Sequence, residues 1–170
     1  MSTAFPDIID PWRMVQARRI FEGGLSLKDM PRLCEGLAEC EGKIAYTIEF
    51  GTDSFGTAFL DLHVEADLPM TCQREFKTFP YAITLDQRLG LVQNEADEAG
   101  LSEEYEALLV SDNQLRLHDV IEDELILALP VVALSPGVPL EEEPVGLQAP
   151  PEEDVRPHPF AALGKLKSPH

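Results

Sequence analysis

The chain has 170 residues, of which 44% are hydrophobic and 26% are charged, and these fractions of an ordinary globular protein exclude wholesale disorder. A compact domain of this length buries roughly 70% of its extended-chain surface, so it needs no disulfide or metal to be stable. The formal net charge of -18 argues against a broad nucleic-acid-binding surface, because such binding depends on Lys and Arg displacing counterions from phosphates.

The first forty residues predict a helix, an extended segment and a second helix. Asp10 and Pro11 supply a capping side chain and a proline at the first helical position, and WRMVQARR continues the helix for about two turns. Residues 21–27 look extended, although Gly23 and Gly24 interrupt them. From Ser26 onward, apolar residues recur at spacings of three and four, which predicts a helix with one buried face: Leu27, Met30, Leu33, Cys34, Leu37 and Ala38.

The middle of the chain predicts antiparallel strands. KIAYTIEF (residues 43–50) and TAFLDLHVEADL (residues 57–68) alternate apolar and polar residues, and the turn sequence GTDSFG lies between them. The polar side of the second run has the carboxylates and imidazole of a metal site. Ligands in a straight row do not surround an ion, so we interpret this side as solvated. The next run, TCQREFKTFPYAITL (residues 71–85), predicts one or two strands broken at Pro80.

An acidic stretch and an apolar helix follow. Residues 94–107 are weakly patterned, which predicts a surface loop or a short helix. Asp119 and Glu122 have the spacing of a capping box ahead of an apolar segment that Pro130 ends. We expect a largely buried helix, with Glu122, Asp123 and Glu124 on its one solvated side.

The carboxyl-terminal part of the chain is dominated by proline and acid. Seven prolines lie between positions 136 and 159, next to the clusters EEE and EED, so residues 135–158 are predicted to be an acidic, extended linker. Residues 159–170 regain an apolar rhythm with two nearby lysines and are predicted to be a docking segment. Residues 1–134 then form a single α+β domain, with an antiparallel sheet of about four to six strands and two or three helices. Closure of that sheet into a barrel is left open.

The three cysteines do not predict a disulfide framework or a zinc site. Cys34, Cys40 and Cys72 are odd in number and have no repeated spacing, and Glu75 stands where the second thiolate of a CxxC pair would be. No signal-peptide pattern or stretch of membrane-spanning length is present. We therefore expect reduced cysteines, a cytoplasmic location, no metal and no cofactor.

The search for catalytic motifs finds none. No phosphate-cradling glycine loop and no G-x-S-x-G turn occur, and the four histidines are scattered along the chain. We expect a protein that is not an enzyme. The alternative is an unrecognised site, which would be a deep pocket where His63 or His118 lies beside carboxylates.

Four segments, in this order, give the chain a family resemblance: DPWRMVQARRIFEGG, TCQREFKTF, IEDELILALPV and RPHPFAALGKLK. Together they resemble the YceD family, the large ribosomal RNA subunit accumulation proteins. Members commonly carry CxRC at the second segment and further cysteines after the third. Here Cys72 and Arg74 are kept, but Glu75 replaces the second cysteine and no cysteine follows Leu134, so a metal-binding role does not carry over.

The resemblance implies a non-enzymatic role in the synthesis, processing or stability of large-subunit (23S) ribosomal RNA. It also points to a basic large-subunit ribosomal protein, whose gene tends to lie beside those of the family. The charge is consistent with such a partner, because residues 95–154 hold seventeen acidic residues and one basic residue. The same acidity is also typical of proteins that only need to stay soluble.

Two kinds of partner-binding residue are predicted. The acidic segment would bind a basic ribosomal protein or a large-subunit assembly intermediate. The arginines and the basic tail would contact a second protein or, in the alternative function, ribosomal RNA directly. The candidate partner-binding residues are Arg13, Arg18, Arg19, Glu141, Glu142, Glu143, Phe160, Leu163, Lys165 and Lys167. The other explanation for the arginines is ordinary solvated charge on a helix surface. The segment IEDELILALPV has the pattern of a core helix, so its resemblance to the family indicates a shared fold more than a binding site.

Overall fold

The computed structural model describes residues 7–137. The whole predicted docking segment and all but the first three residues of the predicted linker lie outside the described residues. The boundaries proposed for the domain, linker and docking segment therefore stay predictions.

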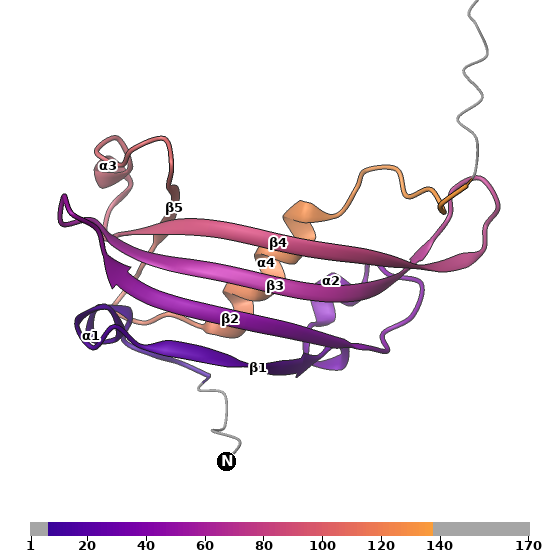
Figure 1. The fold of residues 1–170 in the computed structure, drawn as a ribbon, viewed down its shortest axis with the longest axis horizontal. Coiled ribbons are helices and arrows are strands. Elements are labelled where there is room, and N and C mark those ends of the chain that lie inside the picture. The colour runs from indigo at the N-terminus through magenta and orange to yellow at the C-terminus, as the bar shows by residue number, and fades with distance from the viewer. Residues whose placement is uncertain (1–6, 138–170) are drawn as a thin grey trace, which may run out of the picture. The chain divides into compact units, whose positions relative to one another are not determined.

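The described part of the chain is built on one open, five-stranded sheet (Figure 1). Its strands lie in sequence order, and the first four are antiparallel neighbours, while the last pairs in parallel with the fourth. They are β1 (Ile20–Ser26), β2 (Lys43–Thr52), β3 (Ala58–Thr71), β4 (Thr78–Val92) and β5 (Glu106–Leu109). The α+β prediction is confirmed, and the sheet does not close into a barrel.

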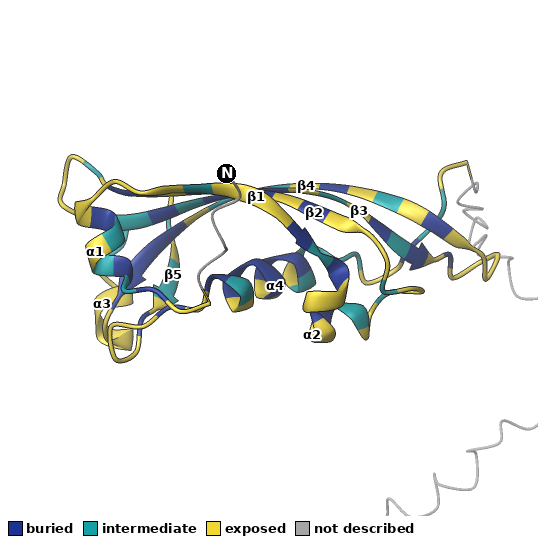
Figure 2. Cartoon of the chain, turned by 90° about the horizontal axis from the view of Figure 1, so that it is seen from below, coloured by how far each residue is buried: buried dark blue, intermediate teal, exposed yellow. Residues whose placement is uncertain are grey.

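The helices gather on one side of this sheet, as Figure 2 shows. They are α1 (Pro11–Gln16), the 3-10 turn η1 (Leu27–Asp29), α2 (Pro31–Cys34), α3 (Glu95–Glu98) and α4 (Leu117–Ala128). Helix α4 is the longest, and it supplies Leu117, Ile121 and Leu125 to the core without measurable exposure. The core therefore lies between α4 and one face of the strands, while the opposite face is open to solvent.

The alternating strands bury the residues that the sequence pattern selects. In β2, Ile44, Ile48 and Phe50 are fully buried, and they lie on the same face as Leu60 and Val64 of β3. Because successive side chains of a strand point to opposite faces, the residues between them reach the open face. The start of α1 is also confirmed, since the Asp10 carboxylate accepts the backbone N–H of Trp12 and Arg13.

The second predicted helix is wrong in extent. Only η1 and the four residues of α2 are helical between Ser26 and Lys43. Pro31 disfavours helical dihedrals at the residue before it, and Met30 accordingly has a non-helical φ of -120° and ψ of 75°. Leu27, Met30 and Leu33 are nevertheless fully buried, so the periodicity located the buried side chains but not the backbone that carries them.

Two predictions about the later strands also need correction. Strand β4 runs from Thr78 to Val92 without a break at Pro80, because this strand has no further strand beside it at that point. Strand β5 follows α3 in the acidic stretch, where only a loop or a helix was expected. Its four residues are too short to show a period, and its parallel pairing with Leu89–Val92 of β4 supplies the missing support.

Cys34 and Cys40 form a disulfide across a separation of six residues, with Cα atoms 5.4 Å apart. The expectation that all three cysteines are reduced is therefore wrong for this pair. Closely spaced cysteines at either end of a short irregular segment were not a recognisable framework in the sequence. Cys72 is the free cysteine.

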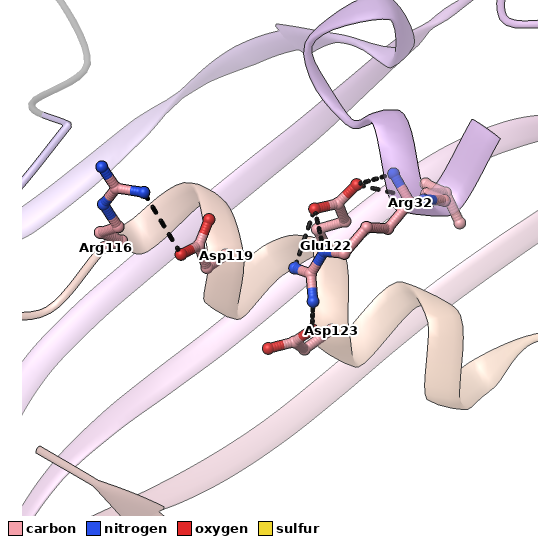
Figure 3. A network of polar contacts seen from close by, with 6 residues as sticks. Arg32, Arg116, Asp119, Glu122 and Asp123 are labelled. Atoms are coloured by element: carbon pink, nitrogen blue, oxygen red, sulfur yellow. Dashed lines mark hydrogen bonds and ion pairs between the residues drawn. The ribbon is translucent and has the colours of Figure 1, made fainter. Parts of the chain in front are cut away.

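The acidic residues of α4 are not arranged as the capping-box pattern predicted. The helix begins after Arg116, so Asp119 lies within its first turn, and Glu122 does not cap α4. Glu122 is only 5% exposed and accepts the backbone N–H groups of Arg32 and Leu33 at 2.7 and 3.1 Å. The Arg32 guanidinium bonds the same carboxylate and also reaches Asp123 (Figure 3). This buried carboxylate joins α2 to α4.

Replacing Glu122 with Ala should therefore lower the free energy of unfolding by about 3 kcal/mol, because two backbone donors and a guanidinium lose a buried, charged acceptor. Asp123→Ala is the matched control. It removes only the partly exposed ion pair to Arg32 and should cost less than about 1 kcal/mol. Urea unfolding followed by circular dichroism measures both, and equal losses would contradict this assignment.

Candidate functional site

The three predicted arginines lie close together in the chain at one end of the sheet. Arg13 is on α1, while Arg18 and Arg19 form the turn that leads into β1, and all three are exposed. Arg18 has a φ of 44°, so this turn holds a left-handed residue. The Arg19 guanidinium lies 5.8 Å from the centre of the Phe21 ring, which orients it over the start of β1.

The other predicted binding residues lie outside the described residues: Glu141, Glu142, Glu143, Phe160, Leu163, Lys165 and Lys167. Their roles stay predictions. The acidic segment that contains the three glutamates is described only up to Gly137.

The first part of that acidic segment forms an exposed group of carboxylates that runs from α3 to the start of β5. We call it the acidic shelf, and it consists of Glu95, Asp97, Glu98, Glu103, Glu104 and Glu106, all of them exposed. Four of these glutamates line a hollow of about 500 Å³ together with Gln87 and Arg88 of β4. Several carboxylates thus line the hollow, as a binding site for a cationic group requires.

Arg88 is the basic residue of this lining, and its positive charge is already paired with the carboxylate of Asp61. Its guanidinium donates two hydrogen bonds of 2.7 Å to the carboxylate of Asp61, and it stacks against the rings of Phe59 and Tyr105. The Asp61 carboxylate is the main reason why the pKa of Arg88 is raised. Tyr105 in turn donates to Asp53 at 2.9 Å. These contacts fix the loop before β5 against the sheet.

Glu124 is a second buried carboxylate of α4 and is only 7% exposed. Unlike the oxygens of Glu122, its Oε2 has no hydrogen-bond partner among the described residues. Burial raises the pKa of Glu124, and the negative charge of Glu106 raises it further, whereas a hydrogen bond from Gln87 lowers it. Gln87 also donates to Glu106 at 3.4 Å. Sequence reasoning placed Glu124 on the solvated side of α4, so this residue was missed as a candidate.

The open face of the sheet carries the row of polar side chains whose residue types resemble those of a metal site. His63 of β3 lies across from Asp86 of β4, with Nδ1 2.6 Å from Oδ1, and its Nε2 is 3.5 Å from Glu65. The hydrogen bond with Asp86 is the main cause of the raised pKa of His63. Within residues 7–137, no three His, Cys, Asp or Glu side chains are placed to share a metal ion.

The family comparison adds to this geometry. A family model described as large ribosomal RNA subunit accumulation protein YceD matches residues 60–167, which is 108 of the 170 residues. The chain belongs to the YceD family. A curated YceD protein of that description from Haemophilus influenzae is 28% identical over 167 residues, covering 95% of each chain. No solved structure matches the chain. Among the described helices, none has the length and apolar content to cross a bilayer.

The YceD-like segment TCQREFKTF contains the turn between β3 and β4, and only its first residue and its last two belong to strands. Thr71 ends β3, Thr78 begins β4, and Cys72 is fully buried between them, as expected of a packing residue. Phe79 is buried as well. Phe76, which we expected to anchor this segment together with Phe79, is instead 81% exposed with a φ of 56°. The turn directs this ring into solvent.

Cys72 is held by the segment that follows α4. The backbone N–H of Ser135 lies 3.4 Å from the sulfur and the Ser135 hydroxyl lies 3.5 Å from it. Hydrogen bonds to the sulfur, first from the Ser135 N–H and next from the Glu75 N–H, lower the pKa of Cys72 from 9.0 to about 7. Because α4 is thus connected to the β3–β4 turn, this cysteine has a structural partner that a CxxC search does not consider.

We expect the thiolate absorbance of the disulfide-intact protein to rise with a midpoint near pH 7, because Cys72 is its free thiol. Ser135→Ala removes the hydroxyl donor and should raise the midpoint, whereas Ser111→Ala changes a serine with no contact to Cys72. A midpoint at 9 in the unaltered protein would contradict the hydrogen-bonded sulfur.

The His63 imidazole should titrate above its ordinary pKa of 6.5 in an NMR experiment. Asp86→Asn should lower that pKa, because the imidazolium loses its nearest carboxylate. Asp67→Asn, on the same strand, is the control and should leave it nearly unchanged. Because the folded-state pKa is raised, the stability that this pair contributes is present below pH 6.5 and is lost as the pH rises through the folded pKa.

Proposed function

We propose that this protein supports the synthesis, processing or stability of large-subunit ribosomal RNA in the cytoplasm, without catalysing a reaction. Membership of the YceD family is the observation that carries this proposal. The Haemophilus influenzae relative has the same description as the family model, and it aligns with the chain over nearly its full length. The role transferred is the one that the family description gives. The geometry then suggests the kind of molecule that is bound.

Our proposed direct partner is a basic ribosomal protein or assembly factor. The acidic shelf presents six exposed carboxylates, and the one arginine that lines its hollow is occupied by Asp61. Large-subunit precursors contain both RNA and basic proteins, and a surface of this sign attracts the basic proteins and repels phosphate.

Direct RNA binding is the second candidate. It is favoured by the three exposed arginines beside β1, of which Arg19 is oriented by the Phe21 ring. Arginine is well suited to phosphate, because its guanidinium donates in a fixed, bidentate geometry. The arginines lie beside β1, at one edge of the sheet, whereas the shelf lies beside β4 and β5, at the other edge. An RNA contact at the β1 edge is therefore compatible with a basic protein on the shelf.

A shelf variant tests the proposal. Replacing Glu98, Glu103, Glu104 and Glu106 with Gln should weaken cosedimentation with large-subunit precursors about tenfold at low salt and flatten its salt dependence, because opposite charges drive the encounter. The control replaces Glu22, Glu35, Glu39 and Glu49, four exposed glutamates outside the shelf, and alters the net charge equally. Cosedimentation of tagged full-length protein on sucrose gradients gives the readout.

The alternative has its own measurement. Crosslinking in cells followed by RNA sequencing should recover little ribosomal RNA if contact is through a protein. Strong recovery that disappears in an Arg13, Arg18 and Arg19 to Gln variant, with the shelf variant unaffected, would replace the protein-partner proposal by direct RNA binding. Absence of any precursor association in the unaltered protein would remove both.

A further inference from the structure

Most of β4 lacks a strand on its outer side. Its inner side pairs with β3 from Thr78 to Gly90, whereas on its outer side β5 pairs only with Leu89–Val92. Residues 78–88 therefore have no outer strand partner in the part of the chain that the structure describes. An unpaired strand edge presents a row of backbone donors and acceptors that an extended chain can continue.

The hydrogen bonds around β4 show which residues carry these outward groups. The Cys72 N–H donates to the Lys77 carbonyl, so this pair is hydrogen-bonded across the β3–β4 turn. In an antiparallel ladder such pairs alternate, and residues 79, 81, 83, 85 and 87 then bond β3. The residues between them point outward. In the same alternation, the Val92 carbonyl points to the outer side, where it accepts a hydrogen bond from the Val110 N–H.

The usable part of the edge is short and well defined. Pro80 has an outward position but no N–H, which blocks pairing at the start of the strand. Ala82, Thr84 and Asp86 follow with free outward positions on β4, and β5 begins to pair at Leu89. Residues 82–88 thus offer room for one short added strand. On the covered face of the same stretch, Ile83 is buried, and Leu85 and Gln87 are half-buried.

The end of this edge leads to the hollow of the acidic shelf. Gln87 and Arg88 belong to the edge and also line the hollow. The hollow is further lined by the four glutamates of the shelf, Glu98, Glu103, Glu104 and Glu106. An independent feature lies beside them: the Glu124 carboxylate is more than nine-tenths buried, with Oε2 lacking a hydrogen-bond partner among the described residues. Glu124 does not line the hollow itself, but Gln87 and Glu106, which do, are among the groups that interact with its carboxylate, so it lies behind that part of the lining.

We propose that residues 82–88 of β4 bind an extended, basic segment of a protein as an added strand, whose Lys or Arg side chain enters the hollow and pairs with Glu106, next to the buried charge of Glu124. Backbone hydrogen bonds to the edge would provide affinity without demanding a sequence, and the carboxylates would select a cation at one position. This inference rests on the proposed function and names the segment of the basic partner that is recognised.

Charge disfavours the other occupants of this edge. A second copy of the chain brings another net charge of -18 and the same shelf, so edge-to-edge pairing would place like charges together. RNA would bring phosphates to the same carboxylates. A basic segment is the occupant for which the edge, the hollow and Glu124 are all complementary.

Thr84→Pro is the decisive variant, because proline removes an outward N–H while the hydrogen bonds of its neighbours to β3 remain. Thr84→Val keeps the N–H and is the matched control. A photo-crosslinking residue at Ala82 reports on the edge, and one at Glu49 of β2, on the open face, reports on non-specific contact. The probe is the purified set of ribosomal proteins from a bacterial large subunit, incubated with the full chain.

We expect the Ala82 probe to crosslink to a Lys- and Arg-rich segment of one of these proteins. Thr84→Pro should reduce that crosslink at least tenfold and Thr84→Val should not, with circular dichroism and thermal melting showing that both variants fold. Glu106→Gln combined with Glu124→Gln should weaken the same crosslink and its salt dependence several-fold. The control pair Glu95→Gln and Asp97→Asn on α3 should have a smaller effect.

Crosslinking that is insensitive to Thr84→Pro, equal at Glu49, or directed to a second copy of the chain or to RNA would overturn the edge proposal. If the Thr84→Pro variant also cosediments fully with large-subunit precursors, the edge proposal falls while the proposed function stands. If the unaltered protein associates with neither precursors nor ribosomal proteins, both fall.

Discussion

The packing of α4 against one face of the strands is the interaction on which the rest of this structure depends. Leu117, Ile121 and Leu125 of the helix are fully buried, as are apolar residues of β2 and β3, and the opposite face of the sheet is left in water (Figure 2). A single helical layer covers the sheet without closing it. The polar rows on the open face, the unpaired side of β4 and the exposed carboxylates before β5 all follow from this one-sided cover.

Helix α4 also carries two buried carboxylates with opposite surroundings. Glu122 is surrounded by donors from α2, which compensate for its burial and make it part of the fold. Glu124, less than a turn away, has Glu106 beside it and one oxygen without a donor. A carboxylate of the first kind stabilises the native packing. One of the second kind is costly on its own and would become favourable beside a bound cation, which is why we propose that it contributes to recognition.

The accuracy of the sequence predictions followed the length of the periodic pattern. The β2–β3 hairpin was predicted correctly because eight residues before the turn and twelve after it alternate. The helix expected after Ser26 was wrong because Pro31 disrupts its backbone, although the buried residues were right. Strand β5 was missed because four residues carry no period. Of the candidate site, the exposed arginines and the acidic stretch were visible as composition, whereas Glu124 and the edge of β4 were not.

The sequence by itself determined the alternation that makes the sheet one-sided, the capped start of α1, the acidic polarity of the chain and the resemblance to the YceD family. These are local patterns, and each depends on residues close together in the chain. Only the tertiary structure decided that Glu122 meets Arg32 across ninety positions, that Cys34 pairs with Cys40, and that β5 lies parallel to β4 and leaves its edge open. The physical reason is that burial and pairing depend on distant segments meeting, which no local pattern encodes.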